Sequence, residues 1–128
     1  MNGPLLVDSS VWINFFRGKD SKQVRILTEY LEQDWQIYLC PTIVQEILQG
    51  IRDDRQFEEV KKYLLAFDIL TGNPLEMAIG AAKLYRNTRS KGHTIRKSND
   101  CLIAYYALKH NVLVLHQDRD LGNWGLGE

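Results

Sequence analysis

The chain has 128 residues, and its 45% apolar and 25% charged residues are typical of one globular domain, which we expect to span residues 1–128. A formal net charge of zero excludes a general electrostatic attraction to nucleic acid or membrane, so any such attraction must be local. No apolar run approaches the roughly 20 residues that span a bilayer, and the N-terminus has no signal-peptide pattern, so we expect a cytoplasmic location and no membrane partner. Cys40 and Cys101 form neither a metal motif nor a disulfide framework, which favours two reduced thiols.

Short apolar runs alternate with segments of helical periodicity along the whole chain. In chain order we expect strand Leu5–Val7, helix Val11–Phe16, helix Ser21–Gln33, strand Ile37–Cys40, helix Pro41–Gly50, helix Asp54–Ala66, strand Phe67–Leu70, a helix from Pro74 to about Arg89, a helix capped by Ser98 that runs to Leu108, strand Val112–Leu115 and a final strand Trp124–Leu126. This alternation predicts an α/β fold with a mostly parallel sheet covered on both faces. Ligands bind such sheets beyond the carboxyl ends of the strands.

Four acidic residues lie where an apolar segment begins, ends or turns. Asp8 closes the first strand, and Asp118 follows the strand Val112–Leu115. Glu46 interrupts the apolar pattern of its helix, and Asp100 opens a nearly uncharged helix. Converging carboxylates are the ligands that hard cations such as Mg²⁺ and Mn²⁺ prefer. The set therefore favours a metal site that activates water for attack on a phosphodiester.

Each of these acids also has a purely structural interpretation. Asp8 is a good helix cap, although Ser9 or Ser10 would serve equally well. Asp100 in a first helical turn gains from the helix dipole, and Glu46 lies at the edge of an apolar stripe where a solvated residue is common. Asp118 fits a polar turn. The placement of the four as a set, rather than any single position, carries the functional hypothesis.

The segment between Met77 and Asn99 contains no acid and six cations, which are Lys83, Arg86, Arg89, Lys91, Arg96 and Lys97. Basic charge is therefore concentrated next to Asp100. We expect Arg96 and Lys97 to contact the phosphates of an RNA substrate, with a solvated helix face and loop as the alternative. Similarly, the aromatic residues of the first helix, Trp12, Phe15 and Phe16, either face a partner chain or pack in the core.

Four groups of residues follow one another along the chain: Asp8-Ser9-Ser10-Val11-Trp12-Ile13, then Glu46, then Ser98-Asn99-Asp100-Cys101-Leu102-Ile103-Ala104, and last Leu113-Val114-Leu115-His116-Gln117-Asp118-Arg119-Asp120. With these groups in this order, the chain resembles PIN-domain ribonucleases, and among them VapC toxins. The resemblance covers almost the full length. It implies a PIN-like α/β/α sandwich and a Mg²⁺- or Mn²⁺-dependent endoribonuclease of a toxin-antitoxin pair. It further implies an antitoxin that blocks the site and a homodimer.

Carried over by position, the resemblance makes Asp8 and Asp100 the principal metal ligands, Asp118 a further ligand, and Glu46 a ligand or a water-orienting group. All four would be catalytic. Two positions depart from the family pattern: His116 replaces a small hydroxyl residue, and Leu121 stands where phenylalanine is common. These departures leave open how the last acid role is divided between Asp118 and Asp120.

Three other functions compete with this hypothesis. A catalytically silent PIN-like module that binds RNA or protein is the main alternative, but a pure binder has no use for mutually repelling carboxylates. A haloacid-dehalogenase-like phosphatase needs a second aspartate where Ser10 stands. A phosphoacceptor receiver domain needs an acidic pair before Asp8 and a lysine after a late strand, and the sequence supplies neither.

Overall fold

The computed structural model describes residues 3–91 and 98–117. Strands and helices alternate in the order β1 (Leu5–Val7), α1 (Ser9–Phe16), α2 (Lys22–Gln33), β2 (Ile37–Leu39), α3 (Pro41–Gln49), α4 (Asp54–Leu64), β3 (Asp68–Ile69), α5 (Pro74–Ser90), α6 (Ser98–His110) and β4 (Leu113–Leu115). The expected final strand Trp124–Leu126 lies outside the described residues. Within the described residues, no helix is both long enough and apolar enough to cross a membrane.

The four strands form one sheet in the order β3-β2-β1-β4, and every neighbouring pair is parallel. Leu5 of β1 is paired with Ile37 of β2 on one side and with Leu113 of β4 on the other. Because β1 is central, it is buried on both faces, and all three of its residues are at most 1% exposed. The predicted α/β class with a parallel sheet is confirmed.

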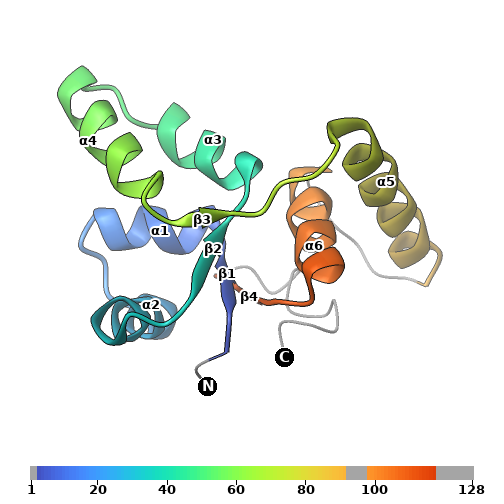
Figure 1. The fold of residues 1–128 in the computed structure, drawn as a ribbon, viewed down its shortest axis with the longest axis horizontal. Coiled ribbons are helices and arrows are strands. Elements are labelled where there is room, and N and C mark those ends of the chain that lie inside the picture. The colour runs from blue at the N-terminus through green and yellow to red at the C-terminus, as the bar shows by residue number, and fades with distance from the viewer. Residues whose placement is uncertain (1–2, 92–97, 118–128) are drawn as a thin grey trace.

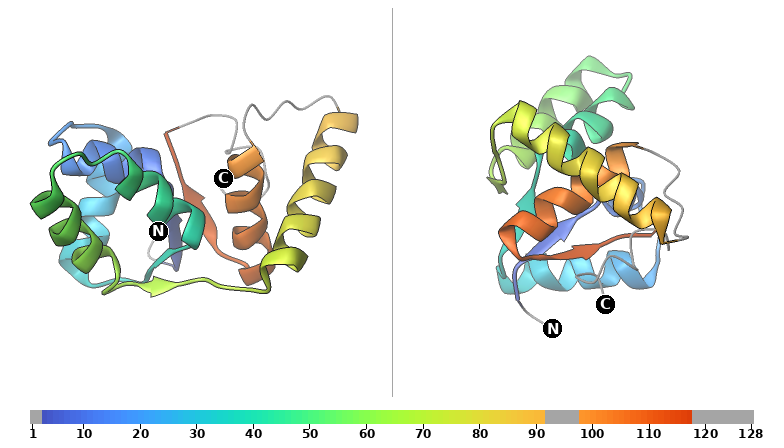
Figure 2. Two further views of the ribbon diagram at one scale, coloured as in Figure 1. Left: turned by 90° about the horizontal axis from the view of Figure 1, so that it is seen from above. Right: turned by 90° about the vertical axis from the view of Figure 1, so that its right-hand side faces the viewer.

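Helices cover both faces of this sheet, as Figures 1 and 2 show. α1 and α2 lie on one side, while α6 lies on the other side with α5 outside it. α3 packs against both α1 and α6, so it bridges the two helical layers. This arrangement brings the middle of α3 close to the first turns of α1 and α6.

Local capping groups set where the helices begin. The Ser21 hydroxyl accepts a hydrogen bond from the backbone N–H of Val24 at 3.0 Å and starts α2. The Asp53 carboxylate accepts from the N–H of Gln56 at 2.9 Å and starts α4. The Asn73 side chain accepts from two N–H groups at the start of α5, where proline occupies the first turn.

The strands β2 and β3 are shorter than the sequence predicts. The apolar pattern predicts Cys40 as the end of the second strand, but this residue is instead the N-cap of α3, with Pro41 in the first turn. β3 contains only two residues, and it pairs with β2 alone at the edge of the described sheet. Phe67, which the pattern also assigns to that strand, packs instead on the ring of Trp12 in α1.

Candidate functional site

Asp8 lies at the carboxyl end of the central strand and is the N-cap of α1. Its Oδ2 accepts hydrogen bonds from the backbone N–H of Ser10 at 3.3 Å and from the Ser10 hydroxyl at 2.5 Å. Its own backbone N–H donates to the carbonyl of Leu115 at 2.9 Å, which ties the ends of β1 and β4 together. The capping alternative is thus correct for Asp8, but capping does not account for its burial, since the residue is only 6% exposed.

Glu46 reaches the same region from the middle of α3. The hydroxyl of Ser9, which is buried, donates to Glu46 Oε1 at 2.8 Å. The sequence predicts Glu46 at the edge of an apolar stripe, and the half-buried position of the side chain agrees with this. The bond from Ser9 fixes the carboxylate toward α1 rather than toward solvent.

Asp100 lies in the first turn of α6 and is half-buried. Residues on its own helical face, Ile103, Ala104 and Ala107, are all buried, as the spacing predicts. Asp100 is therefore on a core-facing side of the helix near the sheet edge, and it lines the same cavity as Asp8 and Glu46.

That cavity has a volume of about 410 Å³ and lies at the carboxyl end of the strands. It is lined by Asp8, Ser9, Ser10, Ile13, Glu46, Gln49, Asp100 and Gln117. Three carboxylates of the four predicted acids thus meet at one cavity. Asp118 and the two predicted phosphate contacts, Arg96 and Lys97, lie outside the described residues.

The electrostatics of this acidic cavity favour a cation. Burial raises the pKa of the Asp8 carboxyl, the hydrogen bonds from Ser10 oppose the rise, and the negative charge of Glu46 adds to it. Burial also raises the pKa of the neighbouring Cys40 thiol to about 12, and the charges of Asp8 and Glu46 contribute to that rise. A positive ion beside these carboxylates would relieve both the desolvation and the repulsion.

The described residues do not form a metal site by themselves. Within residues 3–91 and 98–117, no group of three His, Cys, Asp or Glu side chains is arranged so that it could hold a metal ion. The donor chemistry nevertheless fits a hard cation, because the acidic side chains of the cavity offer carboxylate oxygens alone. A complete metal site would therefore need a ligand from outside the described residues or a movement of the described carboxylates.

Two features of the cavity escaped the sequence interpretation. Gln49 follows Glu46 by three positions on α3, so helical spacing alone could have placed both on one wall. Gln117 also lines the cavity, and its Oε1 accepts a hydrogen bond from Asn14 Nδ2 at 2.9 Å. No sequence signal links Asn14 to Gln117, which are 103 positions apart.

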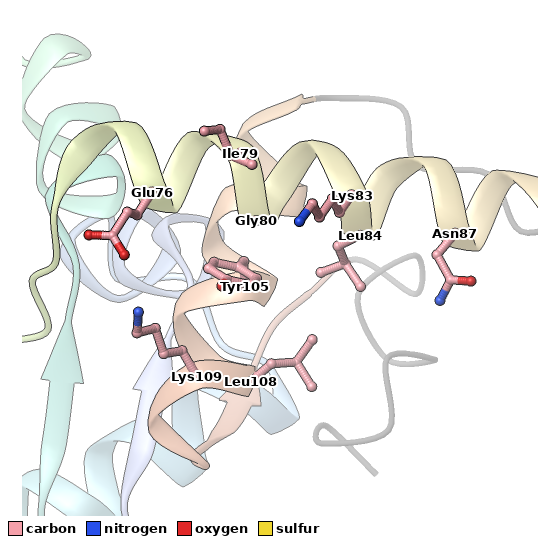
Figure 3. Close-up of a pocket in the computed structure, with 9 residues that line it drawn as sticks. All are labelled: Glu76, Ile79, Gly80, Lys83, Leu84, Asn87, Tyr105, Leu108 and Lys109. Carbon is pink, nitrogen blue, oxygen red and sulfur yellow. The ribbon is translucent and has the colours of Figure 1, made fainter.

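A second cavity, of about 500 Å³, lies between α5 and α6, and Figure 3 shows its lining. Tyr105 of α6 lies beneath Gly80 of α5, and a Cβ atom on that glycine would overlap the Tyr105 ring. Glu76, Lys83 and Lys109 provide its charged groups among otherwise apolar or amide side chains. Although this cavity is larger, one acid beside two cations offers no cluster of carboxylates for metal chemistry.

A parallel sheet with acids gathered at its carboxyl edge is the architecture of the PIN domain, and the chain belongs to the PIN domain family, whose model matches residues 5–124. The VapC ribonuclease Mb1587 of Mycobacterium bovis is 32% identical over 117 residues, which are 91% of this chain and 87% of that protein.

Two solved structures share the fold. That of VapBC2 from Rickettsia felis, bound to a DNA fragment from its promoter, matches with a TM-score of 0.72 and 15% identity, over 95% of this chain and 93% of that one. That of FitAcB from Neisseria gonorrhoeae matches with a TM-score of 0.71 and 18% identity, over 95% and 94% of the two chains. At these identities the structural matches establish the fold alone.

Proposed function

We propose that this protein is a divalent-metal-dependent endoribonuclease that acts as the toxin of a toxin-antitoxin pair. The observation that carries the proposal is the meeting of Asp8, Glu46 and Asp100 at one cavity beyond the carboxyl ends of the strands. The similarity to a VapC ribonuclease over 91% of the chain supports the same reaction and an RNA substrate. Hydrolysis would leave a 5′-phosphate and a 3′-hydroxyl.

In this proposal Asp8, Asp100 and Asp118 hold Mg²⁺ or Mn²⁺, and Glu46 orients the attacking water. When bound, such a cation supplies Lewis-acid activation of the phosphodiester and of the water. Asp8 is suited to its role because the two bonds from Ser10 hold its carboxylate in one orientation. Ser9 fixes Glu46 in the same way, so the two acids are pre-positioned before any ligand arrives.

The test is the nearly isosteric change Asp100→Asn, which removes one ligand charge. Cleavage of single-stranded RNA in Mg²⁺ should fall by about 100-fold or more, the scale of losing one electrostatic interaction with the reacting group. Asp54→Asn is the matched control, because Asp54 occupies the first turn of α4 but is exposed. RNA binding without any cleavage by the wild type would instead favour the catalytically silent binding module.

Phosphate contacts are assigned to Arg96 and Lys97 because of their place just before Asp100. Charge reversal of both should weaken RNA binding and reduce the slope of log affinity against log salt by about 0.7 for each phosphate that is no longer neutralised. Reversal of Arg52 and Lys62, which are exposed, is the control for the same change in net charge. An unchanged slope would indicate that Arg96 and Lys97 are solvated residues that do not contact RNA phosphates.

The partner in this proposal is an antitoxin protein, and the described surface offers an aromatic cluster for it. Trp12 itself is fully buried, so the expectation that it faces a partner chain is wrong and the alternative of core packing is correct for this residue. Phe16 stacks on Trp12 with ring centroids 5.7 Å apart, and Tyr63 of α4 covers both rings while remaining 39% exposed. Leu65, just beyond α4, is 57% exposed. The matches to VapBC2 and FitAcB structures support the search for such a partner.

Co-purification with the product of the neighbouring reading frame tests the antitoxin assignment. Leu65→Ser should weaken that complex without unfolding the toxin, because its side chain is already mostly in water. Leu75→Ser is the control, since Leu75 is 69% exposed and lies on α5, away from the aromatic cluster. Sedimentation of the purified toxin tests the proposed homodimer. Equal affinity of both variants for the partner would exclude the exposed Leu65 side chain from its binding surface.

A further inference from the structure

The acidic cavity has few groups that can donate a hydrogen bond to an RNA strand. The single hydroxyl proton of Ser9 is donated to Glu46, and that of Ser10 is donated to Asp8. The carboxylates are acceptors when they are ionised. Among the described side chains of the lining, the remaining N–H donors are therefore the amides of Gln49 and Gln117.

These two amides differ in how they are held. Gln49 is the exposed last residue of α3. Gln117 is half-buried, and its Oε1 accepts from Asn14 Nδ2 at 2.9 Å across the gap between β4 and α1. The segment that carries Gln117 is also fixed two residues earlier, where the Leu115 carbonyl accepts from the N–H of Asp8.

The hydrogen bond from Asn14 orients the Gln117 amide and so decides which of its ends is available to a ligand in the cavity. Because Oε1 is turned toward Asn14 and accepts from it, we expect Nε2, which can only donate, to be the end available to a ligand. A donor held in this way loses less side-chain entropy on binding than a free glutamine does. Phosphate oxygens and base carbonyls are its natural partners in RNA.

We propose that Gln117 donates from Nε2 to an acceptor of the bound RNA strand and that Asn14 is the positioning residue that sets its orientation. This inference rests on the proposed ribonuclease function and adds a substrate contact to it. Gln117 thereby holds one oxygen acceptor of the strand at this wall, while the acids on the other elements perform the chemistry.

The experiment measures kcat and KM with a short fluorophore-quencher RNA that the wild-type protein cleaves. Gln117→Ala should raise KM by about 3- to 10-fold, the scale of one hydrogen bond, with kcat nearly unchanged. Gln117→Glu keeps an acceptor for Asn14 but removes the donors and adds charge, so it should raise KM further. Gln49→Ala is the matched control for loss of an amide from the cavity wall, and it should have less effect.

A double-mutant cycle separates positioning from a structural role. Asn14→Ala should raise KM in the wild-type background and have no further effect on KM in the Gln117→Ala background. An Asn14→Ala effect of equal size in both backgrounds, or an unchanged KM in Gln117→Ala, would overturn the inference. A wild-type protein that cleaves no RNA would instead refute the proposed function, so the two failures are distinguishable.

Discussion

Replacing Asp8 with asparagine should stabilise the metal-free protein and weaken its response to metal. Asp8 is 6% exposed, and burial raises the pKa of its carboxyl despite the bonds from Ser10, with a further contribution from the charge of Glu46. The folded protein therefore favours the neutral form of this carboxyl more than the unfolded chain does. Asparagine has nearly the same shape, keeps an oxygen that caps α1 and carries no charge.

The expected gain is the difference between two effects. Loss of the charge weakens the hydrogen bond from the Ser10 hydroxyl to position 8, which costs about 1 kcal/mol. Removal of the buried charge and of its repulsion by Glu46 returns more than this, because the pKa of Asp8 is raised despite the Ser10 bonds. We expect a net increase in the free energy of unfolding on the order of 1 kcal/mol at pH 7, which raises Tm by about 3–5 °C in a chain of this length.

This gain should depend on pH with a definite sign. The folded pKa of Asp8 lies above the unfolded pKa, so the stability of the protonated form is fully present below the unfolded value. It is lost as pH rises through the folded value. Wild type and Asp8→Asn should therefore have similar Tm values in acid and diverge toward neutral pH, where the variant is more stable.

Thermal unfolding in EDTA tests the expected stabilisation of the metal-free variant, and unfolding in excess Mg²⁺ tests its weaker response to metal. If Mg²⁺ binds at this cavity as proposed, Mg²⁺ at 100 times its dissociation constant should stabilise the wild type by about 2.7 kcal/mol, and the variant should gain less. Asp53→Asn is the control, because Asp53 also caps a helix but is exposed and does not line the acidic cavity. An Asp8→Asn protein that melts below the wild type in EDTA would refute the reasoning.

Three other predictions each depend on one contact or one buried group. Ser9→Ala removes the 2.8 Å hydrogen bond to Glu46, so it should cost about 1 kcal/mol of stability and lower kcat more than it raises KM. Unchanged kinetics would show that the reaction does not depend on the positioning of Glu46 by Ser9. Gly80→Ala adds a Cβ atom that forces the Tyr105 ring away from α5. Although alanine gains about 1 kcal/mol in helix propensity, the net effect should be a loss of about 1 kcal/mol in the free energy of unfolding measured in urea. In a Tyr105→Ala background the same change should stabilise the protein instead. The Cys40 thiol, with a pKa of about 12, should react with iodoacetamide at pH 8 only on unfolding, and rapid native labelling would contradict its burial.

The sequence predicts the order and type of the described elements because each has a local cause. Apolar runs of three or four residues lie between helices that begin at capping residues such as Ser21 and Asp53. The predicted ends of the strands are wrong where tertiary packing overrides the local pattern. Cys40 is as apolar as a strand residue but caps α3, and Phe67 leaves its strand because it packs on Trp12 with ring centroids 5.4 Å apart.

The acids of the site are predictable for the same reason, since parallel strands must end at one edge. Asp8 follows the central strand, and Asp100 shares a face with buried residues, so both reach the cavity. The groups that hold the acids are not predictable. The hydrogen bond between Ser9 and Glu46 joins residues 37 positions apart, and its existence depends on how α3 packs against α1.

The charge of the cavity implies an order of binding. Asp8, Glu46 and Asp100 all line it, while its described lining contains no lysine or arginine. Without a cation, the negative charge of this cavity would repel an approaching phosphodiester at short range, where solvent screens little. The cation should therefore bind first, and the affinity for RNA should fall in EDTA. Fluorescence anisotropy of a labelled RNA with the Asp100→Asn variant, titrated with and without Mg²⁺, separates this effect from cleavage. An RNA affinity that is equal in EDTA and in Mg²⁺ for both wild type and variant would show that the strand is held away from the acids, and the cavity would then not be the place of the reaction.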